Sequence, residues 1–398
     1  MLPKSLSELY RRVETDRFGP FTFQPGFVAA DVRLALQRVE DAHERFVVSS
    51  LSQVANRLEK EVVVSSVFGT NTIEGGALSE AETARALALD PGQVQEVEQQ
   101  RALNIKAAYD LSRAVAGTPG WSLTTSFIID LHRLLTKDVP HSDNRPGLIR
   151  DNPKTRITYV GDEAHGGRYK PPQYGRDIER LLEALVAWHG ELEAVGVPAP
   201  IRAPLVHLYY EQIHPFWDGN GRVGRVIEAT LLQAAGYRYA PFALARYYLT
   251  NMDSYFTLFN TCRKAAEKKR PAPNQAFVDF HLEGLRLTIN SLQDRVNRLV
   301  ATLLYESGIR RALDEKRINA RQYTILCQLL DRGQPLPLDE VRQAPWYTSL
   351  YLKRNDKTRS RDLRRLREME LAFLDTDNAL WPGFSPPRNI KPLGEKKS

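Results

Sequence analysis

Apolar residues recur at helical spacing along most of the chain, among many Ala, Leu, Glu, Gln and Arg residues that favour helices. The spacing predicts helices over 28–67, 93–115, 124–136, 176–195, 202–213 and 222–235. Ser79, followed three residues later by Glu82, forms a capping-box pattern that predicts another short helix after the break at 74–76. We therefore expect a mainly α fold.

One stretch, residues 143–173, departs from this pattern because it is rich in Gly, Pro and Asn. Its β-branched run at 155–160 is followed by Gly166 and Gly167, which predicts a small β-hairpin set into a helical domain. A long excursion of this kind is often functional, with a plain surface loop as the alternative.

The composition changes after a long helix predicted over 276–303. Three further helices, at 319–330, 338–342 and 358–369, precede a predicted hairpin formed by 371–374 and 379–381. This order is typical of a winged helix-turn-helix domain. We expect the tail from residue 386 onward to be disordered.

The composition of the 398 residues is that of a globular protein, with 42% hydrophobic and 26% charged residues. No apolar run reaches the roughly 20 residues that cross a bilayer, and the polar N-terminus lacks the apolar core of a secretory signal. Cys262 and Cys327 form no disulfide framework, which suits a reducing compartment. We therefore expect a cytoplasmic protein with no membrane partner.

The net charge of +7 is concentrated near the C-terminal end, where residues 301–398 hold 19 Lys and Arg against 13 Asp and Glu. Residues 353–367 alone contain eight basic and two acidic residues. This run resembles the start of a recognition helix with Thr358 as its cap, so DNA is a possible partner. A solvated face with ion pairs, or a surface that docks a target or a second copy of the chain, is the alternative.

The run from His214 to Arg225, HPFWDGNGRVGR, carries the clearest chemistry. An apolar helix ends at His214, whose imidazole is suited to accept a hydroxyl proton near neutral pH. Asp218 follows, and a hard carboxylate there suits Mg²⁺ that bridges phosphate oxygens. Phe216 is apolar between polar neighbours, so we expect it to plug the loop into the core.

The second half of this run is suited to bind a polyphosphate. Gly219 and Gly221 flank Asn220 and permit left-handed backbone angles, so that successive N–H groups can form an anion-binding nest. The helix that follows adds the positive end of its dipole, and Arg222 and Arg225 add forked donors. Base, metal ligand and phosphate nest together indicate phosphoryl or nucleotidyl transfer.

The run matches the Fic family motif, His-x-Phe-x-(Asp/Glu)-Gly-Asn-Gly-Arg-x-x-Arg, at every specified position. The resemblance implies a Fic-type helical bundle that uses ATP and Mg²⁺ to transfer AMP to a Ser, Thr or Tyr hydroxyl of a target protein or of itself. His214 would be the base and Asp218 the metal ligand. The implied phosphate and ATP contacts are Gly219, Asn220, Gly221, Arg222, Gly224 and Arg225, with Arg225 at the terminal phosphate.

Flanking segments extend the resemblance. Residues 155–169 resemble the family's hairpin flap, which pins a target peptide by strand pairing. Residues 247–256 resemble the segment that lines the nucleotide base, and Asn251 and Tyr255 are the candidates there. The alternative interpretation is that the tyrosines of this segment are core aromatics at helical spacing. The implied domains are a helical region with an inhibitory helix (1–110), the catalytic domain (111–270), a helical linker (271–318), a winged-helix-like domain (319–385) and the tail (386–398).

A short run upstream, Thr70 to Gly75 (TNTIEG), resembles the family's inhibitory motif, (Ser/Thr)-x-x-x-Glu-(Gly/Asn). Helical spacing places Thr70 one turn before Glu74, whose carboxylate can pair with Arg225. Such a pair would remove the donor that the terminal phosphate requires and leave ATP misaligned for attack.

Two other functions fit the same residues. One keeps the fold but transfers a different group, such as phosphate, UMP or phosphocholine. The other is a DNA-binding regulator in which the Fic-like unit only senses a nucleotide. The presence of His214, Asp218 and both arginines favours an enzyme, because a sensor would not need the base.

Overall fold

The computed structural model describes residues 9–49 and 51–393. These residues form two compact units, which we describe separately. The first contains the described residues up to Leu51 together with Ala55–Gln293, and the second contains Ser52–Val54 and the described residues from Asp294 onward.

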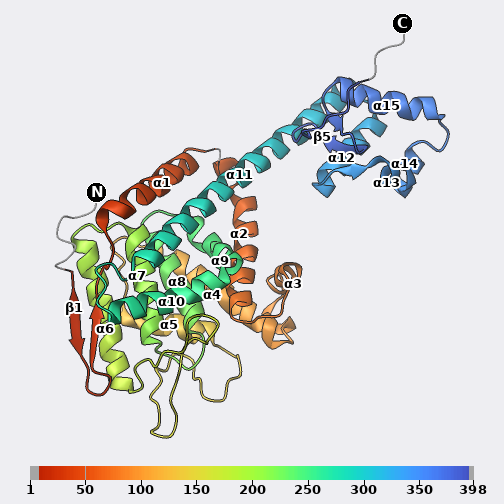
Figure 1. The fold of residues 1–398 in the computed structure, drawn as a ribbon. Helices are drawn as coiled ribbons and strands as arrows, with labels where there is room; N and C mark the ends of the chain where they lie inside the picture. Colours follow the sequence, from red (N-terminus) through yellow and green to blue (C-terminus); the bar gives the residue numbers. More distant parts are fainter. Residues whose placement is uncertain (1–8, 50, 394–398) are drawn as a thin grey trace. The chain divides into compact units, whose positions relative to one another are not determined.

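The first unit is mainly helical (Figure 1). Its elements are α1 (Ala29–Val47), α2 (Leu51–Ile73), α3 (Glu80–Ala86), the 3-10 turn η2 (Pro91–Gln93), α4 (Val97–Ala116), α5 (Thr125–Leu135), α6 (Gly175–Ala194), α7 (Ala199–Ile213), α8 (Asn220–Ala234), α9 (Ala240–Thr250), α10 (Met252–Glu267) and the first part of α11 (Gln275–Asp314). Among the described residues, no helix combines the length and the apolar character that crossing a bilayer requires.

The helices α7 and α8 form the centre of this unit. They pack on each other, α6 packs on α7, and α4 packs on α8. Nearly every side chain of α7 is buried, polar residues such as His207 included. A helix that is surrounded on all sides has no polar face, and its position at the centre fixes the loop that joins it to α8.

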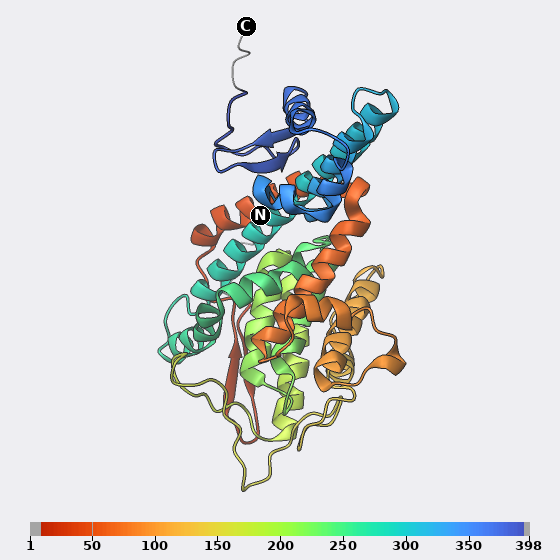
Figure 2. The same cartoon turned by 90° about the vertical axis from the view of Figure 1, so that its right-hand side faces the viewer.

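An N-terminal hairpin, which the apolar pattern does not predict, covers one side of α6 (Figure 2). Strands β1 (Arg11–Glu14) and β2 (Pro20–Phe23) pair antiparallel, with Val13 opposite Phe21. Phe21 and Phe23 are buried, and Phe23 packs against Trp188 of α6 with ring centroids 5.7 Å apart. Strands of four residues show too little alternation of apolar and polar residues to be recognised from the sequence. The hairpin is stabilised by the tertiary packing of its aromatic side chains.

The predicted helix over 28–67 is wrong in its continuity and its end. The structure has two helices, because α1 ends at Val47 and α2 begins at Leu51 and continues to Ile73. At the break, the Ser49 hydroxyl donates a hydrogen bond to the Phe46 carbonyl (2.6 Å). Serine side chains compete with the helix for backbone partners in this way, which apolar spacing alone does not register.

The hairpin predicted over 155–160 and 169 is reduced to a single bridge. Val160 and Tyr169 exchange two backbone hydrogen bonds of 2.8 Å, and the remainder of 143–173 forms irregular loops (Figure 1). Gln173 takes the place of a longer strand partner, because its side chain accepts from the Thr158 N–H (2.7 Å) and donates to the Thr158 carbonyl (3.1 Å).

The second unit combines the end of α11 with short helices and a small sheet. Its further elements are α12 (Ala320–Arg332), β3 (Leu336–Pro337), α13 (Leu338–Gln343), α14 (Pro345–Leu350), α15 (Asp356–Glu368), β4 (Ala372–Leu374) and β5 (Ala379–Pro382). The three strands are antiparallel in the order β3-β5-β4. Ile325, Leu329 and Leu366 belong to the apolar core that these elements share.

Three details of the second unit differ from the sequence-based expectation. The helix α14 was not predicted, and α15 is capped by Asn355, whose side chain accepts from the Thr358 N–H (3.0 Å), rather than by Thr358. The described residues of the tail run beside β4, where Asp375 bridges Ile390 and the Lys391 N–H donates to the Leu374 carbonyl (2.7 Å). Residues 394–398 lie outside the described part. Local composition could not reveal this pairing, because the partner strand supplies it.

We expect His189 of α6 to make the first unit sensitive to acid. The ring is 3% exposed, and its Nε2 accepts a hydrogen bond from Arg202 Nη1 (3.0 Å). Burial lowers the pKa of His189 to about 4, and the charge of Arg202 acts in the same direction. Because the unfolded chain takes up this proton near pH 6.5, the stabilisation is present above that pH and is lost as pH falls toward 4.

Between pH 7 and 4.5, the free energy of unfolding should therefore fall by about 2 kcal/mol more in the wild type than in a His189→Gln variant. Urea unfolding of both proteins at the two pH values measures this difference. Equal pH dependence in the two proteins would show that His189 is not the responsible group.

Candidate active site

The loop between α7 and α8 is locked into one shape by its own side chains. Asn220 closes it, because its side chain accepts from the Phe216 N–H (3.0 Å) and donates to the Phe216 carbonyl (2.8 Å). Phe216 is fully buried, as predicted, and stacks on His132 with ring centroids 3.6 Å apart. His214 (φ 50°) and Gly219 (φ 81°) take left-handed backbone angles at the two ends. The loop therefore holds His214 in a defined position.

Two residues that the sequence did not single out support this loop from outside it. His132 accepts from the Gly147 N–H at Nδ1 (2.9 Å), which leaves Nε2–H to donate to the Asp218 carbonyl (3.1 Å). Arg150 is fully buried and donates through Nε to the His214 carbonyl (2.7 Å). Both lie far from the motif in sequence, and no local pattern marks them.

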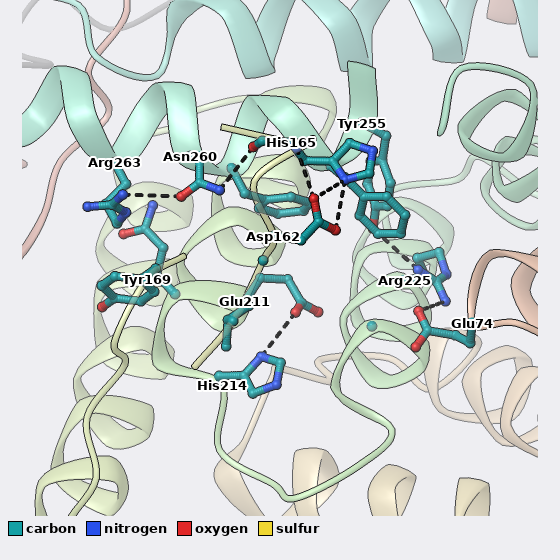
Figure 3. A pocket seen from close by; sticks show the side chains of 16 residues that line it. Glu74, Asp162, His165, Tyr169, Glu211, His214, Arg225, Tyr255, Asn260 and Arg263 are labelled. Carbon is teal, nitrogen blue, oxygen red and sulfur yellow. Dashed lines mark hydrogen bonds and ion pairs between the residues drawn. The ribbon is translucent and has the colours of Figure 1, made fainter. Parts of the chain in front are cut away.

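The two arginines of the motif are buried and face different carboxylates. Arg222 Nη2 donates to Asp218 Oδ2 (2.8 Å), one turn away. Arg225 Nη2 donates to Glu74 Oε1 (2.7 Å) and, at 3.3 Å, to the Thr70 carbonyl (Figure 3). Burial lowers the pKa of Arg225, but the charge of Glu74 outweighs it and the pKa is raised overall. Arg225 is thus a cation held beside a single carboxylate.

A pocket of about 310 Å³ lies where these residues meet. Its walls come from the bridge region of residues 160–169, the end of α7, the start of α8, and α10 (Figure 3). Five of the predicted site residues line it, namely His214, Gly221, Arg225, Tyr255 and Glu74. The base candidate and the buried cation therefore share one cavity.

Other predicted residues serve the site without lining the pocket. The Asn220 side chain is used in the loop lock, and the Thr70 hydroxyl is paired with Tyr109 Oη (2.8 Å). A Cβ at Gly224 would lie 2.6 Å from Glu211 Oε1, so this glycine allows α8 to pack closely on α7. The predicted phosphate contact of Gly224 stays a prediction.

Two predictions about this region need correction. Of the two glycines that flank Asn220, only Gly219 has a left-handed backbone angle. Gly221 is needed for a different reason, because an added Cβ there would overlap the Glu74 carboxylate. Asn251 does not line the pocket, because it stands between α9 and α10 and donates to the Tyr247 carbonyl (2.9 Å). The next turns of α10 supply Phe256 and Asn260 in its place.

A buried polar chain fixes Arg225 from behind. Arg225 Nη1 donates to Tyr255 Oη (3.4 Å), which donates to His207 Nε2 (3.0 Å), and His207 Nδ1 donates to Glu228 (2.6 Å). Burial on its own raises the pKa of Glu228, but the adjacent histidines hold it well below its usual range. The chain keeps Arg225 aimed at the pocket, and its members come from three helices, so sequence spacing could not assemble it.

Asp218 is the one predicted metal ligand in the motif. Its side chain is 33% exposed, and burial raises its pKa, but the Arg222 guanidinium and the Gly219 N–H hold the value below normal. Among the described residues, no cluster of three His, Cys, Asp or Glu side chains could hold a metal by itself. A single carboxylate fits Mg²⁺ that arrives with phosphates, since such sites use one or two carboxylates and the substrate's own oxygens.

Glu211, which the sequence did not single out, lies beside the imidazole of His214 (Figure 3). Its Oε2 is 3.6 Å from His214 Nδ1, and both Nδ1 and Glu211 Oε1 are buried without a hydrogen-bond partner among the described residues. A small rotation would close this gap. Because a carboxylate accepts, closing the gap would place the proton on Nδ1 and leave the Nε2 lone pair free.

Comparison with known proteins agrees with this geometry. Residues 122–232 match the model of the Fic/DOC family, so the chain carries a Fic/DOC domain. Two proteins named protein adenylyltransferase Fic are similar to it: the one from Aedes aegypti is 27% identical over 194 residues, and the one from Culex quinquefasciatus is 29% identical over 195. Each match covers 48% of this chain and 36% of the relative, so the chain spans about a third of the length of these relatives.

Solved structures share the fold. A Fic family protein from Desulfovibrio desulfuricans G20 aligns with a TM-score of 0.55 at 17% identity, over 94% of this chain and all (100%) of that one. A Fic-domain protein from Bacteroides thetaiotaomicron aligns with a TM-score of 0.53 at 20% identity, over 65% of this chain and 97% of that one. At these identities the likeness concerns the fold alone.

We predict that Glu211 sets the tautomer of His214. A hydrogen bond to a charged group contributes roughly 1.5–3 kcal/mol, so Glu211→Leu should reduce the ratio of the Nδ1–H to the Nε2–H form by on the order of tenfold. ¹⁵N NMR of the imidazole distinguishes the two forms. Glu183→Leu, which removes an exposed carboxylate from α6, serves as the control. An unchanged ratio in Glu211→Leu would show that Glu211 does not set the tautomer of His214.

Proposed function

We propose that this protein is an adenylyltransferase that transfers AMP from ATP to a Ser, Thr or Tyr hydroxyl of a target protein or of itself, and that Glu74 inhibits it. The observation that carries this proposal is the buried Arg225 in the same pocket as His214, with Glu74 as its partner. A buried cation that shares a cavity with a base suits a substrate that brings its own phosphates.

In the proposed reaction, His214 Nε2 takes the proton from the target hydroxyl. The hydroxyl oxygen forms a bond to the α-phosphorus of ATP as the bond from that phosphorus to the bridging oxygen breaks, and pyrophosphate leaves. Glu211 acts as a positioning residue that holds the ring and favours the imidazolium, with its carboxylate 3.6 Å from Nδ1. Positioning and charge neutralisation do most of the work in such transfers.

The start of α8 supplies donors for the phosphates. Its first intrahelical bond runs from the Val223 N–H to the Gly219 carbonyl (3.0 Å), so the N–H groups of Asn220, Gly221 and Arg222 precede the ladder. A helix N-terminus of this kind favours anions. Asp218 would hold Mg²⁺, which would neutralise phosphate charge during the transfer.

Glu74 would restrain this reaction by competing for Arg225. Its carboxylate accepts from Arg225 Nη2 at 2.7 Å, and Gly221 leaves room for it where a side chain would overlap. An incoming terminal phosphate needs the same guanidinium. ATP would bind productively only after Glu74 moves, and misplacement of about 1 Å can lower a rate on the order of a hundredfold.

The two sequence-based alternatives, transfer of another group and DNA binding, are tested separately from this proposal. Transfer of another phosphate-containing group uses the same nest and base, and the mass added to the protein distinguishes it. DNA binding through residues 353–367 stays a prediction. Within that run, Arg364 pairs with Glu368 (3.0 Å), and Asp362 is buried and accepts from Arg321 (2.9 Å), so part of its charge is already paired.

We predict that Glu74→Gly raises auto-modification by ATP and Mg²⁺ roughly a hundredfold, because it frees Arg225 for the terminal phosphate. Intact-mass analysis after incubation measures the gain, which should equal one or more AMP groups. A gain equal to phosphate would favour the alternative transferase. An unchanged rate would exclude Glu74 as an inhibitor.

The matched control is the double variant Glu74→Gly/His214→Ala. It should lose transfer by at least about a hundredfold, since general-base catalysis contributes roughly 10²–10⁴-fold. ATP binding, measured by calorimetry, should persist because Arg225 and the start of α8 are unchanged. Retained activity would show that His214 is not the base.

A further inference from the structure

A second groove, which the proposed reaction does not use, adjoins the active-site pocket. It has a volume of about 560 Å³ and shares Tyr169, Gln212 and Arg263 with the pocket as lining residues. Its other walls come from the N-terminal hairpin, the end of α10 and the segment that leads into α11. The groove and the pocket are therefore neighbours that meet at these three residues.

The lining of this groove is strongly basic. Among the described residues that line it are four cations, Arg12, Arg263, Lys269 and Arg270, against one carboxylate, Glu267. Glu267 already accepts from Arg263 Nη1 (2.6 Å). Arg12 pairs with Glu14, but both side chains are more than half exposed, at 57% and 67%, and such pairs contribute little. The groove therefore presents a positive field beside the pocket.

Lys269 and Arg270, two exposed cations of the groove, follow the end of α10. Lys269 (φ 51°) ends the α10 turn, and the Arg270 N–H donates to the Ala265 carbonyl (2.9 Å). Behind them, Asn274 Nδ2 donates to the Gln24 carbonyl (2.9 Å) and to Tyr209 Oη (3.1 Å), which ties the α11 segment to the hairpin strand. The backbone that carries these two cations is thus ordered before any ligand arrives, which lowers the cost of binding.

The floor of the groove distinguishes an extended ligand from a small anion. Phe18, Phe21, Pro271 and Tyr209 line it together with the cations, so the groove combines apolar and basic surface. The cations come from β1, from α10 and from the segment that follows α10, and a free phosphate would leave the apolar side chains without a partner. A polypeptide with spaced carboxylates matches both the charges and the apolar floor.

We propose that this basic groove binds an acidic segment of the target polypeptide next to the hydroxyl that is modified. The proposal deepens the proposed function and rests on it for the identity of the acceptor. It assigns the substrate class as hydroxyl-bearing segments flanked by Asp or Glu. The groove holds the flank while Tyr169, at the shared wall, marks where the chain enters the pocket.

The test compares two fluorescein-labelled peptides, Glu-Asp-Glu-Gly-Thr-Gly and its uncharged counterpart Gln-Asn-Gln-Gly-Thr-Gly. Fluorescence anisotropy with the wild-type protein, without ATP, should show binding of the acidic peptide that weakens as salt rises. Lys269→Asp/Arg270→Glu should raise its Kd by about tenfold or more, because two attractions become repulsions. Aspartate tolerates the left-handed angle of residue 269.

The matched control, Arg33→Glu/Lys60→Glu, reverses two exposed cations on α1 and α2 and should leave the Kd unchanged. In the Glu74→Gly background, kcat/KM for AMP transfer should favour the acidic peptide, and the groove variant should remove that preference. Circular dichroism confirms that each variant is folded.

Equal binding of both peptides, or an unchanged Kd in the groove variant, would overturn the proposal. Tighter binding of a single-stranded DNA oligomer that displaces the acidic peptide would overturn it in favour of a nucleic-acid site. The binding measurements need no ATP, so they can fail while the mass experiment on Glu74→Gly succeeds. If the acidic peptide binds but the mass experiment shows no transfer, the proposed function is wrong and the groove is a basic peptide-binding site only.

Discussion

The hydrogen bonds between Asn220 and the backbone of Phe216 are the constraint on which the rest of the site depends. The Asn220 side chain both accepts from the Phe216 N–H (3.0 Å) and donates to the Phe216 carbonyl (2.8 Å), which closes the loop between α7 and α8. Phe216 itself is inserted into the core against His132. Because the loop cannot open without exposing Phe216 and unpairing buried polar groups, His214 is fixed relative to the start of α8. A base and a phosphate cradle keep their spacing only on such a rigid support.

In the proposed function, the buried charge of Arg225 would take part in both inhibition and catalysis. A guanidinium that is 3% exposed needs a partner, and Glu74 and Tyr255 provide it in this structure. Breaking a buried ion pair is costly unless another anion replaces the one removed. A terminal phosphate is such an anion, so in the proposed function the electrostatic requirement that stabilises the Glu74 contact would also favour ATP once Glu74 moves.

Recognition of the motif from the sequence was possible because its residues act within one loop and one helix turn. His214, Gly219, Asn220 and Arg225 are neighbours along the chain and remain neighbours in space. Arg150, His132 and Glu211 could not be found in this way. The first two reach the loop from distant segments, and Glu211 is one polar residue in a helix whose side chains are almost all buried. Asn251 was chosen because residues 247–256 resemble a family segment, but it is not among the residues that line the pocket, and its side chain donates to the Tyr247 carbonyl.

The amino-acid sequence alone predicted the helical character of the chain and the loop that carries His214 and Arg225. These features depend on local periodicity and on residues close together in the chain. Only the tertiary structure decided which glycine is left-handed, that Gly221 makes room for Glu74, and that the N-terminal hairpin and the end of α10 form one basic groove. Such features arise where segments distant in sequence meet, and the packing that joins them has no local signature.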